Sequence, residues 1–325
     1  RCISSSAGSL MPQQLLQRGQ AEAPGDTSRG PQAQRLLTPR FWGMLLVALG
    51  ALGFSSGIFF NRSIAMMTGP QIAFFRALCG FSFFSLLAAR DPQAFHVRSY
   101  RSAIPWLIGL GVSVGATATL YMTSLRYTTA ATAVLLNNTA VIYVALFSPW
   151  MLKEARPRFT WVSLALALVG MTLITDPAHI EVGSDSWVGV LTALTTGVTY
   201  AFVMLFSRRL GGRVSGVTQS WWSIGIAALI AAPFAVGTSW ELVRANWYWL
   251  LALGTLSLSI PYFLYFQGLK RLNAQVVSMI GLLEPVCGVL IGIFLFREIP
   301  SALGFVGIGL IFASIVLISW RNVDL

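Results

Sequence analysis

The stretch that decides the fold is residues 121–154, YMTSLRYTTAATAVLLNNTAVIYVALFSPWMLKE, because a weaker copy of it follows later in the chain. The copy starts 144 residues further on, at residues 265–298, and reads YFQGLKRLNAQVVSMIGLLEPVCGVLIGIFLFRE. The alignment continues without a gap to residues 174 and 318, and its matches are Tyr121 with Tyr265, Leu125 with Leu269, Ala130 with Ala274, Lys153-Glu154 with Arg297-Glu298, and Leu173-Ile174 with Leu317-Ile318. One module is therefore used twice.

Composition places both copies in a membrane. The chain is 55% hydrophobic and 10% charged, whereas soluble domains carry about 25% charged residues. A run of about 20 apolar residues spans a bilayer as a helix. Ten such runs occur, at Phe41 to Phe60, Pro70 to Ala89, Ala103 to Thr123, Thr128 to Phe147, Phe159 to Ile174, Trp187 to Phe206, Val217 to Val236, Trp247 to Gln267, Val276 to Leu295 and Leu303 to Ser319. They lack the alternation of a β-barrel, so we predict an all-α polytopic membrane protein.

The repeat and the spans together predict the domain organisation. Five spans fit within the offset of 144 residues, and an odd number of crossings inverts the second copy in the bilayer. We therefore expect ten transmembrane helices as two inverted five-helix repeats, at residues 41–175 and 187–320, with a cytoplasmic C-terminus at 321–325. Inverted repeats are typical of transporters.

The basic residues predict the orientation. If the N-terminus is cytoplasmic, most of the 22 Lys and Arg residues fall inside, which satisfies the positive-inside rule and places both termini in the cytoplasm. The residues that we assign to the outside are Arg62, Arg126, Arg244, Lys270 and Arg271. The formal charge of +11 is thus a topology signal, and we expect no nucleic-acid partner. We expect an integral protein of a bacterial cytoplasmic membrane.

Residues 1–40 differ from the rest of the chain. They are rich in Gln, Ser, Gly, Pro and Arg and contain no apolar run long enough for a signal-peptide core, so we predict a disordered cytoplasmic tail. The chain begins at Arg1, which makes Met11 a candidate start. An organellar transit peptide is the alternative, although Glu22 and Asp26 fit it poorly because such peptides contain few acidic residues.

Cysteine and histidine usage argues against several chemistries. Cys2, Cys79 and Cys287 are too few and too scattered for a disulfide framework. His96 and His179 fall in loops on opposite faces, so no His/Cys cluster is available for a metal. We expect no metal, no cofactor and no enzymatic activity.

Three motifs carry a family resemblance. Residues 282–292, LLEPVCGVLIG, with Arg297-Glu298 are similar to the second-repeat motif of the EamA branch of the drug/metabolite transporter superfamily. Residues 136–140, LNNTA, with Lys153-Glu154 resemble its first-repeat counterpart, and residues 74–78, FFRAL, resemble its arginine-bearing second span. The resemblance covers roughly residues 41 to 320.

The resemblance implies that spans one to four and six to nine surround a substrate cavity, with spans five and ten outside it. Members of the branch mostly move small metabolites such as amino acids, often outward, and many are thought to be proton-coupled. One departure is visible, since Val141 stands in span four where span nine has Pro285. A bend in the first half is therefore in doubt.

Two ionisable residues lie within the spans, and such residues are candidate functional sites because of their insertion cost. Arg76 in span two could hold a substrate carboxylate through a bidentate hydrogen bond, or could be a structural arginine. Glu284 in span nine could exchange a proton in each transport cycle, or could pair with a neighbouring helix.

Uncharged candidates form a second tier. Asn137 and Asn138 lie in the middle of span four, where unpaired amides are costly. Tyr121 and Tyr265 occupy equivalent repeat positions, and Trp222 lies near the start of span seven. We include all five as candidate substrate-binding residues, with an interfacial aromatic belt as the alternative for the three rings.

These observations favour a secondary transporter that exports amino acids or related small organic solutes by alternating access, as a monomer or homodimer, with protons as a candidate coupling ion. The runner-up is an organic-anion or nucleotide-sugar exchanger, which would want several cavity cations where only Arg76 is evident. A membrane-embedded enzyme or a receptor is less favoured, because the spans offer too few acids and bases and the loops are short.

Overall fold

The protein is described by a computed structural model that covers residues 39–90, 97–128, 130–155, 159–175, 186–297 and 301–320. No β-strand occurs within these ranges. The main helices are α2 (Pro39–Ser55), α3 (Gly57–Ser63), α4 (Gly69–Ala88), α5 (Ile104–Tyr127), α6 (Ala130–Asn137), α7 (Ala140–Leu152), α8 (Thr160–Thr175), α9 (Ser186–Leu210), α10 (Gly216–Ala231), α11 (Trp240–Gly254), α12 (Ile260–Leu269), α13 (Ala274–Gly281), α14 (Leu283–Ile291) and α15 (Ala302–Trp320). The predicted tail up to residue 38 and residues 321–325 lie outside the described part.

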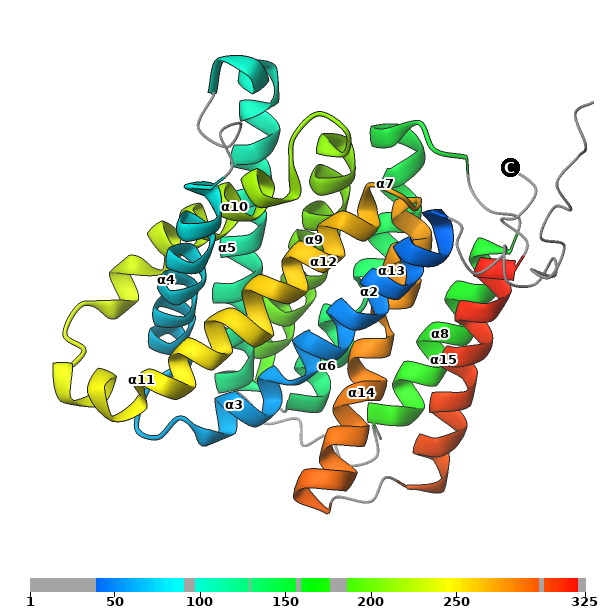
Figure 1. The fold of residues 1–325 in the computed structure, drawn as a ribbon. Helices are drawn as coiled ribbons and strands as arrows, with labels where there is room; N and C mark the ends of the chain where they lie inside the picture. The colour runs from blue at the N-terminus through cyan, green and yellow to red at the C-terminus, as the bar shows by residue number, and fades with distance from the viewer. Residues whose placement is uncertain are drawn as a thin grey trace, which may run out of the picture. The chain divides into compact units, whose positions relative to one another are not determined.

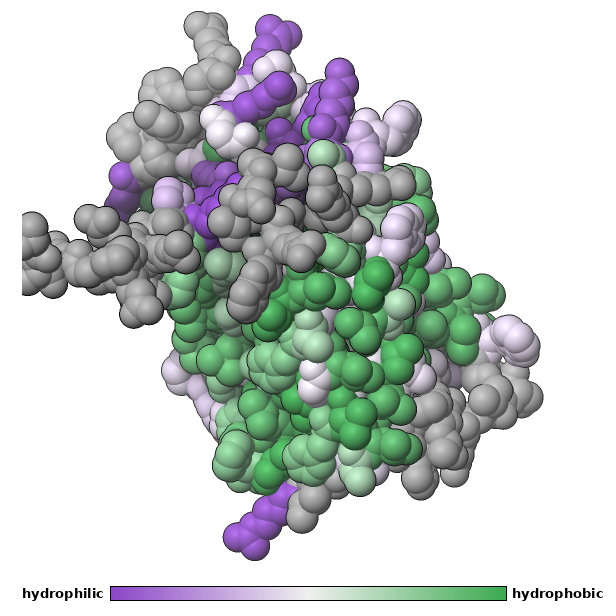
Figure 2. Space-filling view, turned by 90° about the vertical axis from the view of Figure 1, so that its right-hand side faces the viewer, coloured by the Kyte–Doolittle hydropathy of each residue, from purple (hydrophilic) through white to green (hydrophobic). Residues whose placement is uncertain are grey.

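The predicted spans are present as helices. Among the described residues, nine helices are long and apolar enough to cross a membrane, and a shorter apolar helix at Thr160–Ile174 coincides with the predicted fifth span. Helices satisfy their backbone hydrogen bonds internally, which lipid requires. Apolar side chains cover most of the face shown in Figure 2, and polar side chains gather at its upper end. The predicted all-α, ten-span fold class is confirmed.

Short irregular helices complete several of the spans. A 3₁₀ segment, η1 (Val97–Ala103), precedes α5, and another, η3 (Ala232–Ala235), follows α10. A π-helical segment, η4 (Thr255–Ser259), joins α11 to α12 within span eight, and a second, η5 (Gly292–Phe296), ends span nine. Such π-helical turns are frequent at functional sites.

Helix pairing follows the inverted repeat. Span three packs on span six through α5 and α9. The repeat-equivalent pair, spans eight and one, packs through α12 and α2. Spans two and seven pack together as α4 and α10, and spans four and nine as α7 and α13. Spans five and ten, α8 and α15, lie side by side at one edge of the bundle in Figure 1. They cross closely, because a Cβ on Gly170 would lie only 2.7 Å from the Gly307 carbonyl oxygen.

Span four is broken although it has no proline at the break. Helix α6 ends at Asn137, and the repeat-equivalent helix α13 ends at Gly281. In span four, Asn138 Nδ2 donates to the Val134 carbonyl at 2.9 Å and Thr139 Oγ1 donates to the Leu136 carbonyl at 2.5 Å. The Thr139 backbone N–H donates to the same Leu136 carbonyl at 3.2 Å, three residues back, so a tighter turn interrupts the helix here without proline. The first half therefore has an interruption at the repeat-equivalent position although Val141 stands in place of proline.

The structure corrects one part of the predicted topology. Arg208 Nη1 donates to the Leu269 carbonyl at 2.8 Å, so Lys270 and Arg271 lie at the same end of the bundle as Arg208. In Figure 1 the ends of α7 and α12 and the start of α13 share this upper end, while the segment after α14 lies at the lower end with Arg297. Two spans, seven and eight, separate Arg208 from Lys270, and an even number of crossings returns the chain to the same side of the membrane. Lys270 and Arg271 were therefore wrongly placed on the side opposite Arg208, and Arg297 was wrongly placed on the same side as Arg208. With this correction, the end of the bundle that contains Arg208 gains two basic residues and loses one. We call it the basic end and define it by Lys153, Arg208, Arg213, Lys270 and Arg271.

Candidate substrate cavity

A cavity of about 410 Å³ lies inside the bundle. Its lining comes from α2, α3, α4, α5, α6, α9, α10, α11, η4, α12 and α14, which belong to spans one to four and six to nine. Helices α8 and α15 contribute nothing, as the family resemblance implied. The lining is largely apolar, and its polar members are Asn61, Arg76, Thr117, Tyr121, Asn137, Tyr200, Ser257, Tyr262 and Glu284.

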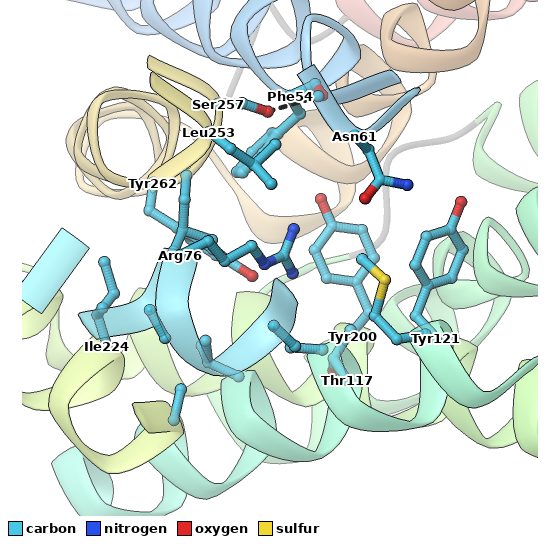
Figure 3. A pocket seen from close by; sticks show the side chains of 18 of the residues that line it. Phe54, Asn61, Arg76, Thr117, Tyr121, Tyr200, Ile224, Leu253, Ser257 and Tyr262 are labelled. Atoms are coloured by element: carbon cyan, nitrogen blue, oxygen red, sulfur yellow. Dashed lines mark hydrogen bonds between the residues drawn. The ribbon is translucent and has the colours of Figure 1, made fainter. Parts of the chain in front are cut away.

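Arg76 lies on α4 and faces the cavity. Close packing of two helices sets its position, because a Cβ on Gly254 of α11 would lie only 2.5 Å from the Arg76 carbonyl oxygen. Figure 3 shows the guanidinium pointing into the space that Asn61, Tyr121 and Tyr200 also face. Within the described ranges the guanidinium has no hydrogen bond and no carboxylate partner. A guanidinium enclosed in this way presents its donors to a ligand.

Glu284 lies in the first turn of α14, directly after the break in span nine. Its carbonyl oxygen accepts a 2.7 Å hydrogen bond from Ser55 Oγ, which ties α14 to α2. Pro285 has no N–H, so the Gly281 carbonyl lacks its usual helical partner. The Glu284 carboxylate lines the cavity and forms no ion pair with any residue that the structure describes. The cavity therefore holds two unpaired groups of opposite charge.

Amides and tyrosines surround these two charges. Asn61 on α3 and Asn137 at the end of α6 each have a buried Oδ1 without a hydrogen-bond partner in the described part of the chain. Unsatisfied buried polar atoms are costly, so these two amides are candidate ligand contacts. Tyr121, Tyr200 and Tyr262 add hydroxyl groups from α5, α9 and α12.

The cavity brings together four of the seven predicted site residues, namely Arg76, Tyr121, Asn137 and Glu284. The other three lie elsewhere. The Asn138 amide bonds back to its own helix, and Tyr265 is 1% exposed and directs its hydroxyl to the Val277 carbonyl at 3.3 Å. Trp222 packs edge-on against Trp221 with 5.7 Å between ring centroids, and is not part of the lining.

Sequence reasoning missed Asn61 and Tyr200. Asn61 falls at the end of the first span, where a polar residue is unremarkable by position alone. Tyr200 had a usable signal, because Thr196 precedes it by four residues and therefore lies on the same face of the predicted span. The neighbouring Thr199 accepts a 2.7 Å hydrogen bond from the hydroxyl of Thr117 of α5, a cavity residue.

The fold and the cavity define a helical membrane transporter. The model of the EamA-like transporter family matches residues 41–176 and again residues 187–320, and the chain belongs to this family. The predicted resemblance is thereby confirmed.

Relatives extend the comparison. The threonine/homoserine exporter RhtA of Escherichia coli K12 is 29% identical over 278 residues, which cover 83% of this chain and 88% of the exporter. The uncharacterized transporter YwfM of Bacillus subtilis is 26% identical over 79% of this chain and 87% of its own length. A solved crystal structure superposes with a TM-score of 0.73 at 19% identity, covering 87% of this chain and 99% of that chain. At that identity it shows the fold alone.

Proposed function

We propose that this transporter exports amino acids or closely related small carboxylates across the membrane by alternating access. The observation that carries the proposal is the guanidinium of Arg76, which lines the cavity without a partner among the described residues. A bidentate pair with a carboxylate would satisfy it. The cavity volume falls within the range of about 300–1,000 Å³ that is typical of small-molecule sites.

Glu284 supports a zwitterionic substrate. Arg76 and Glu284 share the cavity but do not pair with each other, so a ligand that carries both a carboxylate and an ammonium could satisfy both. The same carboxylate is our candidate for exchanging a proton in each cycle. Export as the direction is supported by the similarity to RhtA, which is named as an exporter.

The basic end of the bundle supports the orientation. We propose that it faces the cytoplasm, with both termini on that side, because Lys and Arg are concentrated there. An organic-anion or nucleotide-sugar exchanger is less well supported, since Arg76 is the only cation among the described residues that line the cavity.

Counterflow in proteoliposomes tests the proposal. The purified full-length chain is loaded with unlabelled threonine, and uptake of labelled threonine is compared with uptake of labelled threonine amide, which lacks the carboxylate. We expect the wild type to exchange threonine and not the amide, and Arg76→Gln to lose at least about 100-fold of the exchange, since a charged hydrogen-bonded pair is worth a few kcal/mol. Arg244→Gln, outside the cavity lining, serves as the matched control. Equal exchange of acid and amide by the wild type would exclude the proposed role of Arg76.

A further inference from the structure

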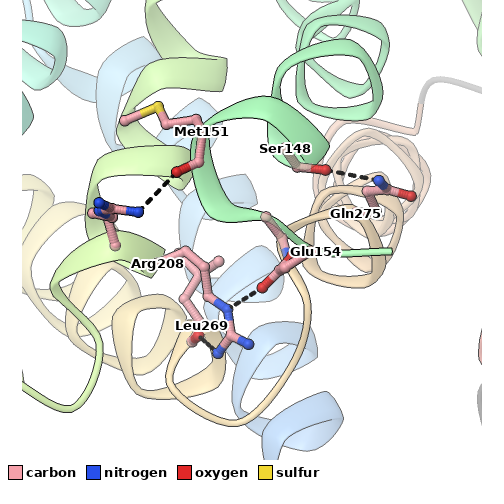
Figure 4. Close-up of polar contacts among 8 residues, drawn as sticks. Ser148, Met151, Glu154, Arg208, Leu269 and Gln275 are labelled. Atoms are coloured by element: carbon pink, nitrogen blue, oxygen red, sulfur yellow. Dashed lines mark hydrogen bonds and ion pairs between the residues drawn. The ribbon is translucent and has the colours of Figure 1, made fainter. Parts of the chain in front are cut away.

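A cluster of charged side chains outside the cavity joins the two halves of the protein at the basic end. Glu154 follows α7, where Lys153 adopts a left-handed conformation with φ 58° and turns the chain out of the helix. One carboxylate oxygen of Glu154 lies 2.5 Å from Arg208 Nε on α9. The other accepts a 3.1 Å hydrogen bond from the backbone N–H of Ala274, at the start of α13. Figure 4 shows the Glu154–Arg208 pair and its surroundings.

Each contact satisfies a group that would otherwise lack a partner. The side chain of the N-cap residue Asn273 makes no capping hydrogen bond, so the Glu154 carboxylate takes over the capping of α13, where the helix dipole favours negative charge. Arg208 also donates to the carbonyl of Leu269 at the end of α12. One first-half carboxylate thereby holds the ends of three second-half helices.

Two neighbouring contacts close the same end. Arg209 Nη1 donates to the Met151 carbonyl at 2.9 Å, which again ties α9 to the end of α7. Gln275 Nε2 donates to Ser148 Oγ at 2.7 Å, and both of these side chains are buried.

The cavity lies away from this cluster, toward the opposite end. The cavity residue Glu284 comes ten residues after Ala274, which corresponds to about 15 Å along a helix. Between the cavity residue Tyr200 and Arg208 on α9, Met204 is 2% exposed and accepts a 3.7 Å hydrogen bond at its sulfur from the hydroxyl of Tyr265, which is 1% exposed. Tyr265 is buried in the same half of the bundle. The basic end is therefore closed in this structure.

We propose that Glu154 and Arg208 form the latch of the inner gate, which must open once in every transport cycle. The inference rests on the proposed alternating access, in which two inverted halves rock so that only one end is open at a time. Opening the basic end moves α7 away from α9 and α13, and this breaks both contacts of Glu154. Arg208 and Glu154 are 23% and 11% exposed, so both charges can be hydrated once they separate.

Thiol accessibility tests the latch without requiring a known substrate. In a chain with Cys2, Cys79 and Cys287 replaced by serine, Ser278→Cys reports on the closed region beyond the latch, and Ala231→Cys reports on the cavity lining. A membrane-impermeant thiol reagent is applied to inside-out vesicles for the first and to intact cells for the second.

Neutralising the latch should shift the equilibrium toward the inward-open state. We expect Glu154→Gln and Arg208→Gln each to raise the labelling rate of Ser278→Cys about tenfold and to lower that of Ala231→Cys, because hydrogen bonds to charged groups are the stronger ones. The matched control is Arg213→Gln, since Arg213 is an exposed arginine of the basic end that makes no contact with the latch among the described residues. Unchanged rates, or rates that rise at both reporters, would overturn the latch.

A locking experiment covers the case in which a neutralised variant does not fold. Ser148→Cys and Gln275→Cys replace two side chains in hydrogen-bond contact, so a short bis-methanethiosulfonate cross-linker, which forms a disulfide with each thiol and releases methanesulfinate, should hold the basic end closed until a reductant is added. We expect cross-linking to stop threonine counterflow reversibly and to leave labelling of Ala231→Cys intact. Counterflow that continues after complete cross-linking would also overturn the inner gate. If the wild type transports no threonine but the labelling shifts occur, the proposed substrate fails and the latch stands.

Discussion

Spans four and nine are repeat-equivalent, and they agree in backbone but differ in chemistry. Both are interrupted at the same repeat position, after Asn137 and after Gly281. Both also end in a left-handed basic residue, Lys153 with φ 58° and Arg297 with φ 57°. The residues at the break differ, since Asn138 and Thr139 bond back to carbonyls of α6 in span four, whereas Pro285 follows the break in span nine. The two spans therefore share the interruption and the left-handed end, and of the two only span nine has a carboxylate, Glu284, at the interruption.

Replacing that carboxylate is expected to have the largest effect. Glu284→Gln should abolish the dependence of threonine transport on a proton gradient, with a loss of at least about 100-fold in gradient-driven flux, because the amide cannot carry a proton. Flux is measured in proteoliposomes with and without an imposed pH difference. Glu241→Gln, a carboxylate at the start of α11, is the control. Transport by Glu284→Gln that still depends fully on the gradient would remove the coupling role.

Restoring a regular helix in span nine tests whether the break itself matters. Pro285→Ala returns an N–H that can reach the Gly281 carbonyl, so we expect a straighter span and a roughly tenfold slower counterflow with little loss of stability. The rate is measured by threonine exchange. Pro233→Ala in η3, outside the cavity lining, should leave the rate unchanged. Wild-type exchange by Pro285→Ala would mean that the break in span nine is not needed for movement.

The break in span four should depend on its side chains instead. Thr139→Val keeps the shape of the side chain and removes the hydrogen bond to the Leu136 carbonyl, which we expect to cost about 1 kcal/mol and a few degrees in Tm. Thermal unfolding in detergent measures the change. Thr192→Val, which loses a similar back-bond to the Val188 carbonyl on the exposed side of α9, is the control and should have a smaller effect. An equal loss of Tm in Thr139→Val and Thr192→Val would show that the Thr139 hydrogen bond stabilises the break no more than an ordinary back-bond stabilises a regular helix.

The smallest effect is expected at the shared left-handed ends. Lys153→Gly and Arg297→Gly should each raise stability by about 0.5–1 kcal/mol, because glycine adopts positive φ without the strain of a Cβ atom. Lys153→Ala and Arg297→Ala retain the strain and should give no gain. Thermal unfolding of the four variants measures this. A gain at one end only would show that the two spans are not equivalent here.

Most of the fold could be predicted from the sequence alone. Apolar runs determine where helices cross a bilayer, because lipid leaves no other way to satisfy the backbone, and the recurrence of residues 121–154 determines the inverted halves. Arg76 and Glu284 were recognisable as candidate site residues because charges are rare in membrane spans. Lys270 and Arg271 were assigned to the wrong side of the membrane because the crossings before them were miscounted. The hydrogen bond between Arg208 and the Leu269 carbonyl shows which end of the bundle they share.

The site was only partly accessible to such reasoning. Most of these helices are apolar on every side, so periodicity does not tell which face points into the bundle. Asn137 and Asn138 are neighbours in the sequence, yet only Asn137 lines the cavity. Equivalent positions also diverge, since Tyr121 lines the cavity while Tyr265 is buried in the core.

The amino-acid sequence by itself thus determined the number of spans, the repeat, the family and the two membrane-embedded charges, because each follows from local composition or from similarity along the chain. Only the tertiary structure decided that the two charges are left unpaired in one cavity and that Glu154 joins the two halves. These properties depend on how helices distant in the sequence are rotated and packed against one another, and no local pattern encodes that rotation.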